Sequence, residues 1–433
     1  MSRRSRRRFA PVGPGSLRIS SRKTIVSTVS AQAVRLVLTV VSGPILSRLI
    51  GPAPYGVLAP AQSISSLGNL VSESGFAYHT VTAKELSEQE ARHIHHQSIR
   101  LSLVIGSIAA VIASMFAAAS LEERLIRAAL TMSMICLAGV TAVPYAWAQR
   151  HGKFAKMQWW GVVTQAASTF VVAIPLALMH LRIWAVGTNL ALPALLTAVV
   201  AWKMAALAGT IPTVAHIPRA FRFGSLTSNL GSYLAGNVDV LTLSTYFSVT
   251  ALGVYSRANL LASLPGTVVA AAVSRVGLVS LSRSEHWSDH FRFLWKATSI
   301  SVLAFSAQAT LAACGLDIMA IAFGPKFSTP PRAFALLTMA QVFFYACSLL
   351  NTYLIVRRRP LVVGITQMIH AAVTATAFMV VRPTRLVDVA WILLIPSAVN
   401  YLGVALYIHL TRPRNQHGIA TDHDKGAGMP EKS

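Results

Sequence analysis

The chain has 433 residues, of which 54% are hydrophobic and only 12% are charged. Soluble domains carry about 25% charged residues, so this composition excludes an ordinary soluble globular protein. Uncharged stretches such as residues 101–119 reach the roughly 20 apolar residues that span a bilayer. The composition therefore predicts an all-α integral membrane protein with many spans.

The net charge of +24 comes from 38 basic and 14 acidic residues, which makes nucleic acid an alternative partner. The basic residues lie between apolar stretches rather than on one soluble face, so we expect no nucleic-acid partner. Cys136, Cys314 and Cys347 all lie in apolar stretches, and the sequence has no Cys/His spacing typical of a metal site. We expect no disulfide, no metal and no cofactor.

Residues 1–23 form a polybasic segment interrupted by Pro and Gly, which predicts a cytoplasmic tail lying on anionic lipid. Its SRRRFA run is also similar to a twin-arginine export signal, but no small-residue cleavage site follows. A tail that fixes the topology is the simpler interpretation.

Twelve apolar stretches are predicted to cross the membrane. They lie near residues 24–47, 56–78, 99–119, 125–147, 158–180, 183–208, 225–247, 251–275, 297–319, 334–356, 360–381 and 386–411. With both termini in the cytoplasm, 26 of the 38 basic residues lie on the cytoplasmic side and 8 on the other. The positive-inside rule therefore predicts cytoplasmic N- and C-termini, and we expect a multi-pass protein of the bacterial inner membrane with no soluble domain.

A motif near the start of the chain, with Gly51, Pro52, Pro54 and Gly56 inside an apolar stretch, has an outline that returns later. ILSRLIGPAPYGVLAPAQS (45–63) has the outline of LSTYFSVTALGVYSRANLL (243–261), at an offset of 197 residues. The corresponding pairs are Ser47 and Ser244, Gly56 and Gly253, and Gln62 and Asn259. This parallel repeat predicts two six-helix lobes, a transporter architecture, although two fused scaffolding halves would give the same pattern. The predicted parts are a tail 1–23, a lobe 24–208, a cytoplasmic linker 209–224, a lobe 225–411 and a tail 412–433.

Polar residues recur at helical spacing along four predicted spans. The four sets are Thr24, Thr28, Gln32, Arg35, Thr39 and Ser42; Gln62, Ser66, Asn69 and Glu73; Asn229, Ser232, Gly236 and Asp239; and Ser256, Asn259, Ser263 and Thr267. Steps of three or four residues place each set on one helix face, which we expect to contact protein or water rather than lipid. Hydrogen bonding between helices would alone explain many of the serines and threonines.

Arg35 is the most informative of these residues because it lies near the middle of its span. A lone arginine at that depth costs about 2.5–3.5 kcal/mol on insertion scales. We expect Arg35 to face the substrate, with a structural ion pair as the alternative. The candidate substrate-binding residues are Gln32, Arg35, Gln62, Asn69, Asp239, Arg257 and Asn259.

Other charged residues are candidates for ion pairing, coupling or gating. Asp239 and Arg257 lie at a similar depth, and an ion pair is predicted because an unpaired buried charge is costly. Contact with the substrate or with a cation is the alternative. The candidates for a gate or for ion coupling are Glu73, Lys203, Arg275 and His370. Lys203 and Arg275 could instead extend to the membrane surface, and His370 could be a packing residue rather than a proton carrier.

The sequence contains no catalytic motif: GxSxG, HExxH, the P-loop and GxGxxG after a strand are all missing. His93 and His96 lie one turn apart in the run 91–96 without a carboxylate or thiol partner, and this run is predicted to be a solvated loop. We therefore do not expect an enzyme.

Two stretches carry a family resemblance. LSRLIGPAPYGVLAPAQSI (46–64) with ESGF (73–76) resembles the start of polysaccharide exporters and lipid-linked oligosaccharide flippases of the multidrug/oligosaccharidyl-lipid/polysaccharide (MOP) superfamily. NVDVLTLSTYFSVTALGVYSRANLLASLP (237–265) resembles the opening of the second lobe of that family. The chain departs from the pattern at 273–283, which lacks the expected proline. The resemblance implies a V-shaped, MATE-like carrier with a cationic central cavity for a sugar-pyrophosphate head.

The expected function is that of a flippase in lipopolysaccharide or exopolysaccharide export. It would move a lipid-linked (pyrophosphate) oligosaccharide to the outer leaflet by alternating access, for exopolysaccharide, capsule or O-antigen assembly. The implied partners are this lipid-linked substrate, polysaccharide assembly proteins and a coupling H⁺ or Na⁺. One alternative is a cation-coupled drug or metabolite antiporter, which should carry acidic mid-membrane residues. Another is a membrane glycosyltransferase or polysaccharide polymerase, which should have longer loops.

Overall fold

The computed structural model describes residues 22–66, 76, 80, 88–116, 120–151, 153–205, 219–283, 287–357 and 359–411. These residues form helices and short connections, with no strand among them. Within this described part, eight helices are long and apolar enough to cross a membrane. The class predicted from composition, an all-α multi-span membrane protein, is confirmed.

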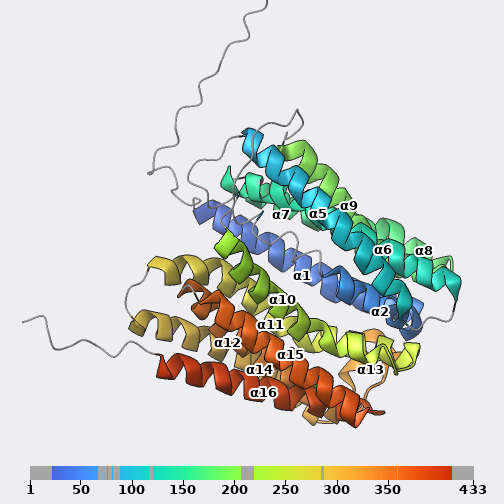
Figure 1. Cartoon of the computed structure of the whole chain (residues 1–433). Coiled ribbons are helices and arrows are strands. Elements are labelled where there is room, and N and C mark those ends of the chain that lie inside the picture. Colours follow the sequence, from blue (N-terminus) through green and yellow to red (C-terminus); the bar gives the residue numbers. More distant parts are fainter. Residues whose placement is uncertain are drawn as a thin grey trace, which may run out of the picture.

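The first group of helices, here called the N-lobe, runs from α1 to α9 (Figure 1). Its members are α1 (Arg22–Ile50), α2 (Pro52–Ser65), α5 (Glu88–Met115), α6 (Leu121–Arg150), α7 (Phe154–Ala166), η1 (Ala167–Ala173), α8 (Ile174–Leu178) and α9 (Arg182–Ala205). The π-helical η1 joins α7 to α8 without a break, so the three elements together correspond to the predicted span 158–180. The run 91–96 lies inside α5 with His95 buried, so the predicted solvated loop is wrong.

The second group, here called the C-lobe, runs from α10 to α16 (Figure 1). Its members are α10 (Arg219–Leu243), α11 (Val249–Arg283), α12 (Trp287–Ala313), α13 (Ile318–Phe323), η2 (Pro325–Phe327), α14 (Pro331–Val356), α15 (Pro360–Val381) and α16 (Leu386–Leu410). Helix α11 continues unbroken through 273–283, where the expected proline is missing. Much of the predicted linker 209–224 lies outside the described residues, so the predicted domain bounds stay predictions.

Helices pack in the same pairs within the two lobes. Helix α1 packs on α7 as α10 packs on α15, and α6 packs on α9 as α14 packs on α16. Helix α2 likewise packs on α6 as α11 packs on α14. This correspondence agrees with the parallel repeat seen in the sequence.

Helix α1 begins, and α16 ends, at one end of the bundle, here called the terminal end; the opposite end is the distal end (Figure 1). The glycines and prolines of the first motif make the distal turn between α1 and α2. Gly51 has a φ of 81°, a conformation that glycine adopts without steric cost, and Pro52 occupies the first helical position of α2.

The two copies of the repeated motif contact each other at the distal end, where α2 packs along α11. A Cβ atom on Gly56 would overlap the carbonyl group of Val249, and one on Gly253 would overlap the carbonyl group of Pro52. Both glycines are therefore required for this close approach. Nearby, Arg48 of α1 donates a hydrogen bond of 2.6 Å to the carbonyl oxygen of Ile321 in α13. The lobes are joined at the distal end by these contacts.

Exposed tryptophans mark two levels on the outer surface. Trp184 and Trp391 lie near the distal starts of α9 and α16, and both are 48% exposed. Trp160 and Trp202 are exposed near the terminal ends of α7 and α9. Tryptophan is enriched where a membrane meets water, so these residues indicate the two membrane surfaces.

Candidate functional site

The C-lobe contains a polar pocket of about 140 Å³ in which three predicted site residues meet. Asp239 of α10, Asn259 of α11 and His370 of α15 all line it. Ser263, which belongs to the predicted polar stripe of α11, also lines it, and three polar side chains that were not predicted complete the lining: Gln341, Tyr345 and Ser397. Five helices thus supply hydrogen-bonding groups to one small space inside an apolar lobe.

Asp239 is the charged group of this pocket and is only 5% exposed. The hydroxyl of Tyr255 and the side-chain nitrogen of Asn259 donate to its Oδ2 atom, the latter over 3.4 Å. Its Oδ1 atom is buried without a hydrogen-bond partner, and no salt bridge to it occurs within the described residues. A buried carboxyl group in this state is stable when it is protonated or when it binds a cation.

Two amide side chains and a histidine line the pocket together with Asp239. The side-chain nitrogen of Gln341 donates to Oδ1 of Asn259 over 2.7 Å, which fixes the orientation of both amides. His370 is 4% exposed, and its Nδ1 atom has no hydrogen-bond partner. Asp239 and His370 therefore each bring one unsatisfied polar atom to the same pocket.

Arg257 does not pair with Asp239 in this structure. Its guanidinium carbon lies 3.7 Å from the centroid of the Tyr55 ring on α2. Tyr255 and Asn259, which hold Asp239, are one turn apart on α11, and Arg257 lies about 200° around the helix from Tyr255. The predicted ion pair is absent from this conformation because Arg257 and the Asp239 partners face opposite sides of α11.

Arg35 is exposed, yet it lies on the packed face of α1. At 100° per residue, Ala31, Ser42 and Leu46 all lie within about 40° of it, and all three are buried. Arg35 is also within electrostatic range of Tyr145 on α6. Its guanidinium is therefore accessible on the side of α1 that faces other helices, and it forms no salt bridge to any described residue.

The remaining predicted residues do not join one site. Gln62 is exposed on α2, and Lys203 is exposed near the terminal end of α9, where a lysine reaches the membrane surface easily. Four predicted side chains lie outside the described part of the structure: Gln32, Asn69, Glu73 and Arg275.

Several pocket residues were missed because the polar residues of α14 and α16 were not included in the sequence pattern. Gln341 and Tyr345 lie one turn apart in α14, on a stripe with Thr338 and Ser348 that could have revealed them, and Ser397 follows Pro396 in α16. Tyr255 precedes Asn259 by four residues, a spacing that could have connected them. Within the described residues, no group of three or more His, Cys, Asp and Glu side chains could hold a metal ion.

The arrangement of helices matches solved membrane transporters. The structure of the lipid II flippase MurJ in an inward closed conformation gives a TM-score of 0.70 at 12% identity, over 89% of this chain and 87% of that chain. A MOP superfamily transporter from Pyrococcus furiosus gives 0.57 at 15% identity, over 90% and 95%. A mutant MATE protein gives 0.56 at 14% identity, over 90% and 96%. The fold is that of a MOP superfamily membrane protein.

The family follows from the sequence. The model of a family described as polysaccharide biosynthesis protein matches residues 45–330, and the chain belongs to that family. A relative from Rhizobium meliloti (strain 1021), the succinoglycan biosynthesis transport protein ExoT, is 23% identical over 334 residues. The match covers 73% of this chain and 65% of the length of that relative. The predicted resemblance to polysaccharide exporters of the MOP superfamily is confirmed.

Proposed function

We propose that the protein moves a lipid-linked oligosaccharide, carried on a pyrophosphate, from the cytoplasmic to the outer leaflet of the bacterial inner membrane. The family match and the name of the ExoT relative support a role in polysaccharide biosynthesis transport. The fold shared with MurJ and the MATE protein supports a carrier rather than an enzyme. Exopolysaccharide, capsule or O-antigen assembly would use the delivered unit.

The observation that carries this proposal is the accessible guanidinium of Arg35 on the packed face of α1. A pyrophosphate is an anion, and a fixed guanidinium offsets part of the cost of removing it from water through charge-assisted, bidentate hydrogen bonds. An inside-negative potential also favours outward movement of negative charge by about 2.3 kcal/mol per charge and 100 mV. A cationic residue on the packed face of a membrane-spanning helix therefore suits an anionic head that travels outward.

The direction follows from the topology proposed from the basic residues, with both termini cytoplasmic. The terminal end is then the cytoplasmic side, and the distal contacts of α2 with α11 close the outer side. The structure would be the state that receives substrate from the cytoplasm. Separation of the lobes at the distal end would release the substrate into the outer leaflet.

The C-lobe pocket is the proposed coupling site. Asp239 lacks a cationic partner there and His370 keeps a free ring nitrogen, so the pocket can take up a proton or a cation. The same carboxyl favours a second candidate function, a cation-coupled antiporter for drugs or metabolites. The two functions differ at Arg35, since an antiporter for cationic compounds has no use for an accessible arginine on the packed face of α1.

The test is complementation of a strain that lacks the gene, with surface polymer and membrane protein level measured together. Arg35→Lys should keep partial transport, because lysine supplies the charge but not the bidentate fork. Arg35→Gln should lose most transport at normal protein level, whereas Lys203→Gln, which removes an exposed charge at a helix end, should retain it. Full transport by Arg35→Gln would refute the proposal, and loss of the protein itself would indicate a structural role.

A further inference from the structure

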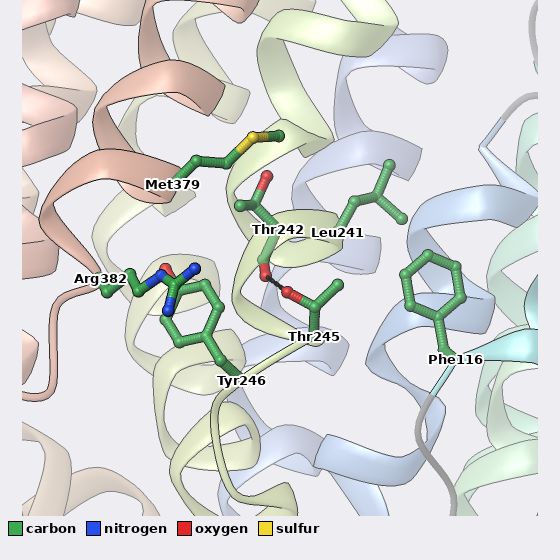
Figure 2. Close-up of a pocket in the computed structure, with 7 residues that line it drawn as sticks. All are labelled: Phe116, Leu241, Thr242, Thr245, Tyr246, Met379 and Arg382. Atoms are coloured by element: carbon green, nitrogen blue, oxygen red, sulfur yellow. Dashed lines mark hydrogen bonds between the residues drawn. The ribbon is translucent and has the colours of Figure 1, made fainter.

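A second hollow of about 720 Å³ lies at the distal end, where the two lobes meet. Figure 2 shows its lining side chains, which come from the end of α10 and the turn after it, from the end of α15 and the residue after it, and from the residue after α5 in the other lobe. They are Phe116, Leu241, Thr242, Thr245, Tyr246, Met379 and Arg382. We call this hollow the rim pocket. Its volume lies within the roughly 300–1,000 Å³ of small-molecule sites.

Arg382 supplies the positive charge of the rim pocket. It caps α15 in the left-handed conformation, with a φ of 47°, a backbone state that non-glycine residues seldom adopt. The side chain is exposed, and it makes no hydrogen bond or ion pair to any other described residue. All its donors are therefore available to an anion.

The threonines of the rim pocket offer acceptors. The hydroxyl of Thr242 donates to the carbonyl oxygen of Val238, and that of Thr245 donates to the carbonyl oxygen of Thr242. Because each hydroxyl has only one proton, the lone pairs of both oxygens remain for a ligand that donates. The aromatic ring of Tyr246, 38% exposed, stands beside them in Figure 2. A sugar could donate its hydroxyls to the two threonine oxygens and place its ring against the ring of Tyr246.

The rim pocket lies at the level of lipid head groups. Arg382 is separated from the start of α16 by only a few residues, and Trp391 on the first turns of α16 marks the membrane surface. Met379, one turn before Arg382, is 63% exposed on the apolar surface of α15. A cationic site with hydrogen-bond donors for an anion thus lies next to an apolar surface.

The floor of the rim pocket is part of the contact between the lobes. Phe116, directly after α5, and Leu241 of α10 both pack on the apolar cluster that contains Ile64 of α2. Separation of the lobes at the distal end would pull Phe116 and Leu241 apart, and the gap between the lobes would then open into the rim pocket. The pocket therefore lies beside the seam through which a released substrate would leave.

We propose that the rim pocket binds the phosphate-bearing sugar head of the lipid-linked substrate as it enters the outer leaflet, with Arg382 on the phosphate, Thr242 and Thr245 on sugar hydroxyls, and the lipid chain along Met379. This inference rests on the proposed function for the identity of the lipid. It assigns a release site that is separate from Arg35 and lies on the α5–α10 side of the lobe contact.

The experiment measures lipid binding to the purified full-length protein by native mass spectrometry, with polyprenyl diphosphate and phosphatidylglycerol as probes. All variants carry Arg35→Gln, so that a central site does not contribute. Adding Arg382→Gln should weaken binding of polyprenyl diphosphate about tenfold, the effect expected for a lost charge-assisted hydrogen bond. Adding Arg385→Gln, an exposed arginine of the same connection outside the pocket, should leave it unchanged.

Equal binding of polyprenyl diphosphate by the Arg382→Gln and Arg385→Gln proteins would overturn the inference. An equal loss of polyprenyl diphosphate and phosphatidylglycerol would also overturn it, because the rim pocket would then be a general phospholipid site. The assay needs no transport, so a failure of the Arg35 transport test leaves this result interpretable. Conversely, a negative result for Arg382→Gln in the binding assay does not contradict the proposed transport function.

Discussion

Arg257 of α11 lies over the ring of Tyr55 on α2, with its guanidinium carbon 3.7 Å from the ring centroid. The two residues belong to different lobes and lie beside the Gly56–Gly253 crossing. Tyr55 also contacts the ring of Phe327 in η2, at 6.3 Å between centroids. One arginine and one tyrosine thus connect three elements of the distal contact, and transport by lobe rocking would require them to separate.

Replacement of the Tyr55 ring should favour the distal-open state. A contact between arginine and an aromatic face contributes about 0.5–2 kcal/mol, so Tyr55→Leu should raise the ratio of open to closed protein by about 2- to 30-fold. Tyr55→Phe keeps the aromatic face and should resemble the parent. Spin labels at Leu121 and Leu316, both exposed at the distal end of different lobes, would report the distance distribution. Identical distributions for the leucine and phenylalanine variants would contradict the prediction.

A methyl group at the helix crossing should have a larger effect. In Gly56→Ala the new Cβ would overlap the carbonyl group of Val249, so α2 and α11 must move apart. Overpacking of this kind costs about 1–3 kcal/mol, which should destabilise the closed state and reduce transport.

Gly187→Ala is the matched control for this change, because a Cβ on Gly187 meets nothing within 4 Å and alanine favours a helix. Melting temperature and surface polymer would be measured for both variants. A Gly56→Ala protein that is as stable and as active as Gly187→Ala would show that the close crossing is not needed.

Asp239 and Arg257 should act independently in this conformation. Because they face different partners, the stability effects of Asp239→Asn and Arg257→Gln should add to within about 0.5 kcal/mol. Denaturation of the two single variants and the double variant in detergent gives the coupling energy. A coupling of about 2 kcal/mol or more would instead support the ion pair predicted from the sequence.

The sequence predicted the architecture well because membrane helices obey simple rules of length and polarity. The repeated glycines at 56 and 253 even indicated the two elements that meet at the lobe contact, although their direct contact required the structure. Helix ends were predicted less well: α5 begins at Glu88, since polar residues near a membrane surface can continue a helix into water.

The site was predictable only in part. Asp239 and Asn259 stood out because they lie on polar stripes, but the stripe on α11 did not show that Arg257 lies on the opposite face from Asn259. The depth argument that paired Asp239 with Arg257 ignored rotation about the helix axis. Gln341 and Tyr345 do lie one turn apart in α14, but the partner that they meet depends on long-range packing of α14 against α11, which the sequence does not show.

Asp239 is the proposed coupling group of the C-lobe pocket. Asparagine has nearly the same shape and can still accept from Tyr255, but it can neither take up a proton nor balance a cation. If the C-lobe pocket couples an ion to transport, Asp239→Asn should remain folded yet lose most of the transport response to an imposed ion gradient.

The measurement is the initial rate at which a fluorescent polyprenyl diphosphate sugar crosses the membrane of proteoliposomes. With a proton or sodium gradient, this rate should rise less than about twofold in Asp239→Asn, against about tenfold in the parent. Asp388→Asn removes a carboxyl group from the first turn of α16, outside the pocket, and should keep the full response. A parental response in Asp239→Asn would mean that the buried carboxyl group serves the packing of α10 against α11 and that coupling, if present, resides elsewhere.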